Sequence, residues 1–314
     1  MTSTTKPLPL LVWGALGAAA AVIGLLPWLV TGGALPLQNL GVTPDQPPVL
    51  LPVSQYYLTS IVALLVVGAA LAGLAARILG RRRPRFGGLL LIAGVLAVQI
   101  VAACQSLLTT RALLERSSRA DVYLFLVGAV IAVSVLTGAL VLCLIAFAPV
   151  PGATIGLSLV ALVTASWVGV ALRDILTFGP DPATTVALFV FRWLPAVLIG
   201  CAIAWCGFGT VGRVAAVVVS LAALWIGPAF FTAVSAAAGT RVLAPYPGEM
   251  AAYGVEVFRM ALTNPEIVLP PIVLAAIIGV LGALLVPVLR RRRSGPPEGD
   301  ASRATSADAS RSTV

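Results

Sequence analysis

The chain has 314 residues, of which 60% are hydrophobic and 10% are charged, and its mean hydropathy is +1.06. Since roughly a quarter of the residues of a soluble domain are charged, the composition excludes a soluble globular protein and indicates a membrane protein. The net charge is +9 and the sequence contains no histidine. The usual haem, copper and catalytic zinc sites therefore lack their commonest protein ligand.

Eight stretches are long and apolar enough to cross a bilayer, which takes about 20 mostly apolar residues. They run approximately over 8–30, 57–79, 87–108, 122–147, 153–172, 185–205, 214–238 and 268–289. The first follows Lys6, but its apolar core is too long for a signal peptide, so it is predicted to be an uncleaved anchor. The predicted fold class is all-α, a polytopic transmembrane helix bundle.

The domain organisation follows from the same stretches. Residues 1–293 are predicted to form one integral membrane helical domain, and 294–314, rich in Ser, Pro, Gly and charged residues, a disordered cytoplasmic tail. The first outer loop, 31–56, holds five prolines and one charge, Asp45. It is expected to be extended and to lie close to the lipid headgroups.

Two arginine clusters directly follow apolar stretches and orient the chain, because Arg and Lys near the ends of spans favour the cytoplasm. The clusters are Arg81, Arg82, Arg83 and Arg85, and Arg290, Arg291, Arg292 and Arg293. They predict cytoplasmic N- and C-termini and are candidate contacts for anionic lipid headgroups. The abundance of Arg, Ala, Gly and Pro indicates a GC-rich genome, hence the bacterial cytoplasmic membrane.

The most unusual charge on the outer side is Arg192. It lies about seven residues, or roughly 10 Å, into its predicted helix, which is deeper than an interface anchor requires. Together with Arg173, Asp174 and Asp181 it forms a candidate site for a solute or a partner. The alternative is that Arg192 extends outward to lipid phosphate, or pairs with Asp174 only to hold two helices together.

A second group of outer charges lies between the last two spans. Residues 248–263 are predicted to form an amphipathic helix that ends at Asn264, with Glu249, Glu256 and Arg259 along one face. Such a helix usually lies in the plane of the interface, although it can also cover a vestibule. These three residues are further candidates for contact with a solute or a partner.

No catalytic, cofactor-binding or metal-binding residue is predicted, and no cofactor. The run Gly207, Gly209, Gly212 fits G-x-G-x-x-G, but a membrane helix precedes it where a nucleotide site needs a strand, so it is interpreted as a turn. Cys201 and Cys206 diverge by about 140° on one helix and cannot share a metal without distortion.

Small and polar residues inside the spans are expected to join helices. Gln99 and Gln105 can make hydrogen bonds between helices, and Gly200 with Ala204 permits a close approach. These features occur in any bundle and do not point to a function.

Three functions remain open. The first is a non-catalytic accessory or scaffold component that meets a membrane protein partner, supported by the lack of catalytic constellations. The second is a permease or channel for a small anionic or amphipathic solute, attracted by Arg173 and Arg192.

The third function is an enzyme that acts on lipid-linked substrates at the outer face. It would have to use the acids Asp121, Asp174, Asp181, Glu249 or Glu256. Nucleic acid is not an expected partner in any of the three, because the basic residues bracket apolar stretches and do not form a folded basic face.

Overall fold

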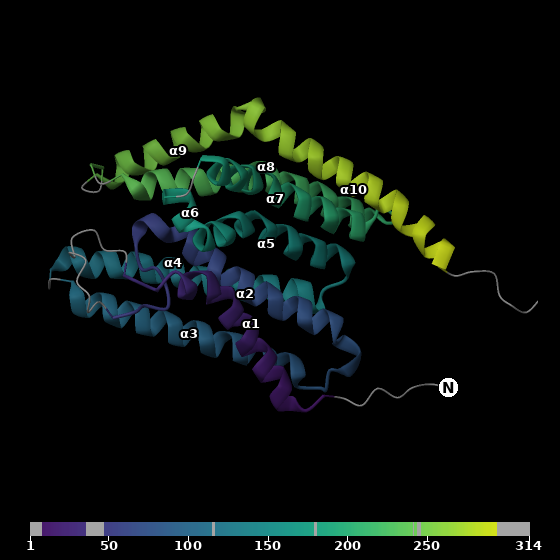
Figure 1. Ribbon diagram of the computed structural model, residues 1–314, viewed down its shortest axis with the longest axis horizontal. Helices are drawn as coiled ribbons and strands as arrows, with labels where there is room; N and C mark the ends of the chain where they lie inside the picture. Colours follow the sequence, from purple (N-terminus) through teal and green to yellow (C-terminus); the bar gives the residue numbers. More distant parts are fainter. Residues whose placement is uncertain are drawn as a thin grey trace, which may run out of the picture.

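The protein is a bundle of long helices that run along its longest axis in the computed structural model (Figure 1). The structure describes residues 8–35, 47–114, 117–178, 181–240, 242–243 and 246–293. The predicted tail 294–314 lies outside this description. The side chains of residues 286–293, which include the second arginine cluster, also lie outside it, as do those of Arg81, Arg119, Asp174, Ile175, Phe178 and Asp181.

Eight of the described helices are long and apolar enough to span a membrane, which confirms the predicted all-α polytopic fold. They are α1 (Leu10–Val30), α2 (Leu58–Ile78), α3 (Gly87–Leu113), α4 (Ser118–Phe147), α5 (Val150–Ala171), α7 (Asp181–Cys206), α8 (Val211–Gly239) and α10 (Pro265–Arg293). The shorter elements are η1 (Gln55–Tyr57), η2 (Gly80–Arg82), α6 (Arg173–Phe178) and α9 (Pro247–Thr263).

Several helices begin earlier than the apolar stretches predict, because their capping residues are polar. The Ser117 side chain accepts a hydrogen bond from the Ala120 amide, so α4 begins at 118 and not at 122. Thr210 caps α8 in the same way. Such caps satisfy amide groups that have no partner within the helix.

Glycines allow the helices to pack closely. A Cβ added at Gly24 of α1 would lie 2.5 Å from Gly68 Cα of α2. One added at Gly200 of α7 would lie 2.8 Å from Ile278 Cβ of α10. The second contact confirms the close approach predicted at Gly200.

The segment that leads from α1 to α2 is buried in protein. Val49, Leu51 and Val53 are completely inaccessible to solvent. They pack in a core cluster with residues of α1, α2, α3 and α4. These apolar side chains anchor the described part of the loop against the bundle, and the expectation that the loop lies close to the headgroups stays a prediction.

Hydrogen bonds from the bundle satisfy the irregular backbone of this segment. The Trp28 indole donates to the Val49 carbonyl at 2.8 Å. The Leu50 amide donates to Gln105 Oε1 at 3.0 Å, and the Leu51 amide to Ser106 Oγ at 2.8 Å. Irregular backbone within a membrane protein is tolerated only where protein or water satisfies it in this way.

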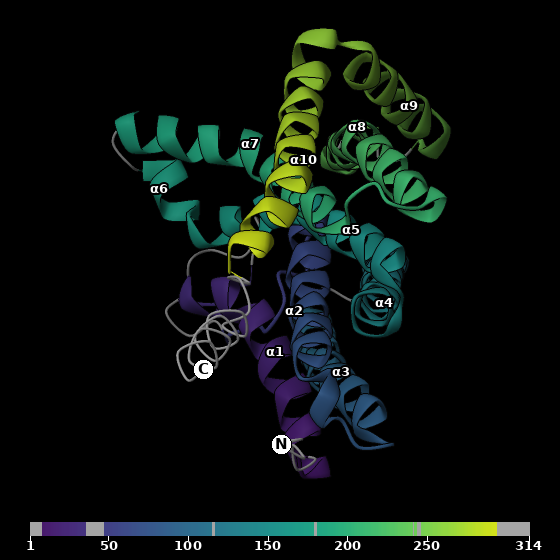
Figure 2. The ribbon, with the colours of Figure 1, turned by 90° about the vertical axis from the view of Figure 1, so that its right-hand side faces the viewer.

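Helix α9 confirms the helix predicted over 248–263 but not its orientation. It packs alongside α8, where a Cβ at Gly254 would lie 3.2 Å from Ala237 Cβ. At its end, α9 meets α10 at a wide bend along one edge of the bundle (Figure 1), and the two diverge when seen end-on (Figure 2). It therefore returns along α8 and does not lie across the ends of the spanning helices.

Candidate functional site

Arg192 joins α7 to the start of α10. Its Nη2 donates a hydrogen bond to the Glu266 carbonyl oxygen at 3.1 Å, and its guanidinium carbon lies 5.5 Å from the centroid of the Trp193 ring. The side chain is exposed on its other sides. This contact with a carbonyl of α10 supports a role in holding two helices together; the predicted pairing with Asp174 lies outside the described side chains.

The Glu266 carbonyl needs this donor because of the sequence that follows it. In an α-helix that oxygen would accept from the amide four residues later, but residue 270 is Pro and has no N–H. Arg192 thus supplies the hydrogen bond that Pro270 removes.

The junction between α9 and α10 has two further supports. The Trp225 indole of α8 donates to the Leu262 carbonyl at 3.1 Å, in the last turn of α9. Asn264 Oδ1 accepts from the Glu266 amide at 3.1 Å and so caps the start of α10, where Pro265 follows it. The break between these helices is therefore fixed by side chains of α7, α8 and the junction itself.

Arg173 makes a different contact from Arg192. Its guanidinium carbon lies 5.9 Å from the centroid of the Trp28 ring of α1. Arg173 and Trp28 line a cavity of about 330 Å³ with Tyr57, Phe191 and the hydroxyl residues Thr59, Ser60 and Ser166. The contacts described for Arg173 and Arg192 thus involve different helices, α1 for Arg173 and α10 for Arg192.

The predicted charged face of α9 is present. Glu256 and Arg259 form an ion pair at 3.7 Å, and their side chains are 58% and 70% exposed. Glu249 is exposed in the first turn, where the helix dipole stabilises a negative charge. Exposed apolar side chains flank the ion pair in the sequence, among them Val255 and Met260.

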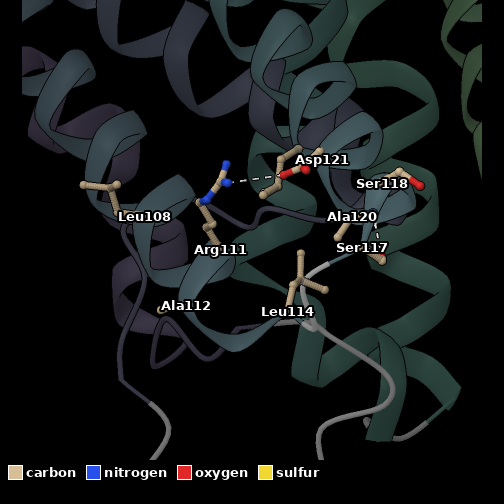
Figure 3. A pocket seen from close by; sticks show the side chains of 9 residues that line it. Leu108, Arg111, Ala112, Leu114, Ser117, Ser118, Ala120 and Asp121 are labelled. Carbon is tan, nitrogen blue, oxygen red and sulfur yellow. Dashed lines mark hydrogen bonds and ion pairs between the residues drawn. The ribbon is translucent and has the colours of Figure 1, made fainter.

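The acid Asp121 has a partner where α3 ends and α4 begins. Figure 3 shows the Arg111 guanidinium directed at the Asp121 carboxylate, and the two are 3.4 Å apart. Both side chains are more than 60% exposed and line a shallow pocket of about 600 Å³. The pair joins the two helices across their connection.

Arg77, in the last turn of α2, is a structural residue that no sequence pattern singled out. Its Nη1 donates to the carbonyls of Ile145 and Ala148, at 2.7 and 3.0 Å, and its guanidinium carbon lies 5.0 Å from the centroid of the Trp205 ring. It thereby caps the C-terminal end of α4, where helical carbonyls lack partners. Arg77 and the C-terminal end of α4 come together only in the folded bundle, so the sequence alone does not predict this contact.

Polar groups inside the described bundle are neutral. Gln99 donates to the Leu65 carbonyl of α2 at 2.8 Å, which confirms a predicted hydrogen bond between helices. Ser158 and Ser220 join α5 to α8 at 2.8 Å. Among the side chains that the structure describes, none that is buried is charged, and no three Cys, Asp or Glu residues gather as a metal site would require.

Comparison with known proteins gives no relative from which a function can be transferred. No protein-family model matches the chain, and neither the curated proteins nor the solved structures give a match.

Proposed function

We propose that this multi-pass membrane protein is a non-catalytic accessory or scaffold component that binds a membrane protein partner through the exposed face of α9. The observation that carries the proposal is the exposed Glu256–Arg259 ion pair, which lies among exposed apolar residues on a helix packed against a spanning helix.

The depth of α9 follows from its contact with α8. Trp225 stands at the middle of α8, 14 residues from either end, or about 21 Å at 1.5 Å per residue. Because the Trp225 indole holds the last turn of α9, that turn lies about halfway along α8. Arg259 is one turn nearer to the outer end.

A surface of this composition suits protein better than lipid or water. Charged side chains at such a depth are costly when they face hydrocarbon, whereas Val255, Met260 and Tyr253 are 58%, 56% and 42% exposed. A protein surface with complementary charges and apolar side chains would satisfy both kinds of group.

The alternatives of a permease and an enzyme have less support. Arg192, the main residue of the transport hypothesis, is used to satisfy the Glu266 carbonyl. Asp121, one of the acids that an enzyme would need, is used in an ion pair. Both contacts join helices, as a scaffold requires.

A photoactivatable amino acid tests the proposal in living cells. At Glu256 it is expected to cross-link a discrete membrane protein, whereas at Val218, which is 61% exposed on α8, it is expected to label lipid. With the photoactivatable residue placed at the neighbouring Tyr253, exchanging Glu256 and Arg259 would keep the ion pair but invert its polarity and should weaken the cross-link severalfold. Lipid adducts alone at Glu256 would show that the charges reach headgroups and would refute the proposal.

We further propose that the protein lies in a bacterial cytoplasmic membrane with both termini in the cytoplasm, and that the arginine clusters contact anionic headgroups there. In the first cluster Arg82 is exposed, while Arg83 stacks on Phe147 and Arg85 on Phe86, at 4.8 and 5.6 Å. Cation–π contacts leave the outer edge of a guanidinium free to meet phosphate. Flotation with vesicles that contain or lack phosphatidylglycerol would measure this contribution.

A further inference from the structure

A cavity of about 770 Å³ lies between α4, the outer end of α8 and the start of α9. Val122, Leu126 and Val130 line it along one side of α4, and Met250 of α9 lies on its border. Val122 and Leu126 are both 58% exposed, so the cavity opens to the surroundings of the bundle. In a membrane these surroundings are lipid.

The cavity is polar at its outer end and apolar below. Ser118, Gln55 and Thr240 line it at the outer ends of α4, α2 and α8. Tyr123 also borders the cavity, but its hydroxyl donates to the Val53 carbonyl at 3.3 Å, so its ring supplies an apolar wall. Polar groups at the interface above an apolar wall match an amphiphile in its membrane orientation.

The length of the cavity matches a lipid chain. Its wall on α4 extends from Ser118 to Val130, about 18 Å at 1.5 Å per residue; one leaflet of hydrocarbon is about 15 Å thick. An acyl chain that enters from the polar end would therefore follow this wall within its own leaflet.

We infer that this cavity is a binding site for a phospholipid of the outer leaflet, with the acyl chain along Val122, Leu126 and Val130 and the headgroup near Ser118. The site does not depend on the proposed partner of α9, because it lies on the side of α8 that faces α4. An acyl chain that packs against protein at near-solid density makes more dispersion contacts than an acyl chain in bulk lipid, and this favours the bound state.

A matched pair of variants tests the site. The full chain is reconstituted in vesicles of phosphatidylethanolamine and phosphatidylglycerol, extracted in mild detergent, and its retained lipids are counted by native mass spectrometry. Wild type is expected to retain one phospholipid. V130W fills the cavity and should lower retention about tenfold, since it displaces roughly two methylenes of the chain; V133W, at a position 62% exposed on the same helix, should not.

Two results would overturn the inference: a wild-type protein that retains no lipid, or equal loss in both variants. Retention of phosphatidylglycerol alone would also overturn it, because a site built on the acyl chain accepts both headgroups. If V130W does not fold, the site is tested in wild type by photolabelling with a phospholipid that carries a diazirine on its acyl chain. Adducts should concentrate at Leu126, Val130 and Met250, whereas an even distribution over Val133 and Leu136 would contradict the site.

Discussion

Arg192 and Glu266 meet through a hydrogen bond that replaces one missing from a helix. The guanidinium of α7 donates to a main-chain carbonyl of α10 at 3.1 Å, and that carbonyl has no helical donor because residue 270 is proline. The unusually deep charge of Arg192 thus supplies the hydrogen bond that Pro270, far along the chain, removes.

This relationship predicts a specific double-mutant cycle. Arg192→Ala should destabilise the protein by about 1 kcal/mol, the net value of one hydrogen bond. Pro270→Ala returns an N–H to the Glu266 carbonyl, so Arg192→Ala should cost clearly less in the Pro270→Ala background. Reversible unfolding of the four proteins in one detergent measures the coupling. Equal costs in both backgrounds would show that Arg192 does not serve this carbonyl.

The segment before α2 gives a second prediction. Gln105 accepts from the Leu50 amide and donates to the Pro48 carbonyl, each hydrogen bond being 3.0 Å or shorter. Gln105→Leu removes both partners and should destabilise the segment by about 1–3 kcal/mol, because partly buried polar groups lose their hydrogen bonds. Hydrogen exchange at Leu50 should accelerate at least fivefold.

Gln105→Glu provides the matched control for that change. The carboxylate still accepts from the Leu50 amide but cannot donate to the Pro48 carbonyl, so exchange at Leu50 should stay close to the wild-type rate. The same acceleration in Gln105→Glu and Gln105→Leu would mean that the side-chain acceptor does not protect this amide.

The sequence predicts the spans well, because membrane helices must satisfy their own backbone and so require long apolar stretches. It also predicts α9, whose charges repeat on one face. The burial of Val49, Leu51 and Val53 was not predictable by the same means. Prolines in an outer loop look the same whether the loop lies on lipid or inside protein, and the deciding partners, Gln105 and Ser106, are about 55 residues away.

The candidate site was harder to predict than the fold. Arg192 is unusual by its depth alone, but the sequence offers several partners, and the acceptor that the structure describes is a main-chain oxygen. One feature of the sequence does predict part of this contact: Pro270 leaves the carbonyl of residue 266 without a helical donor, so another group must supply one. Which side chain supplies that donor depends on the packing of α7 against α10, which no local pattern specifies.

Close packing of α1 on α2 predicts a strong effect of a small change. A methyl group at position 24 would lie 2.5 Å from Gly68 Cα and 2.6 Å from the Leu64 carbonyl oxygen, both of them backbone atoms. Gly24→Ala should therefore cost about 1–3 kcal/mol through overpacking, seen as a lower unfolding temperature in detergent.

Gly128→Ala in α4 is the control for overpacking. The nearest atom to an added Cβ there is Leu107 Cδ1 at 3.9 Å, an ordinary contact. Its unfolding temperature should equal or slightly exceed that of wild type, since Ala favours a helix over Gly by up to about 1 kcal/mol. Similar losses in both variants would attribute the effect to the helices themselves and not to the contact between α1 and α2.

The orientation of the chain is tested by reporter fusions at two exposed turns. Gly80 follows α2 beside the first arginine cluster, and Gly248 lies at the start of α9; a Cβ at either position meets no atom within 4 Å. Because arginines near span ends stay in the cytoplasm, green fluorescent protein after Gly80 should fluoresce and alkaline phosphatase after Gly248 should be active. The reverse result would invert the topology and move the face of α9 to the cytoplasm. If both positions reported the same side, an even number of spans would separate Gly80 from Gly248, and one of the five apolar helices between them would not cross the membrane.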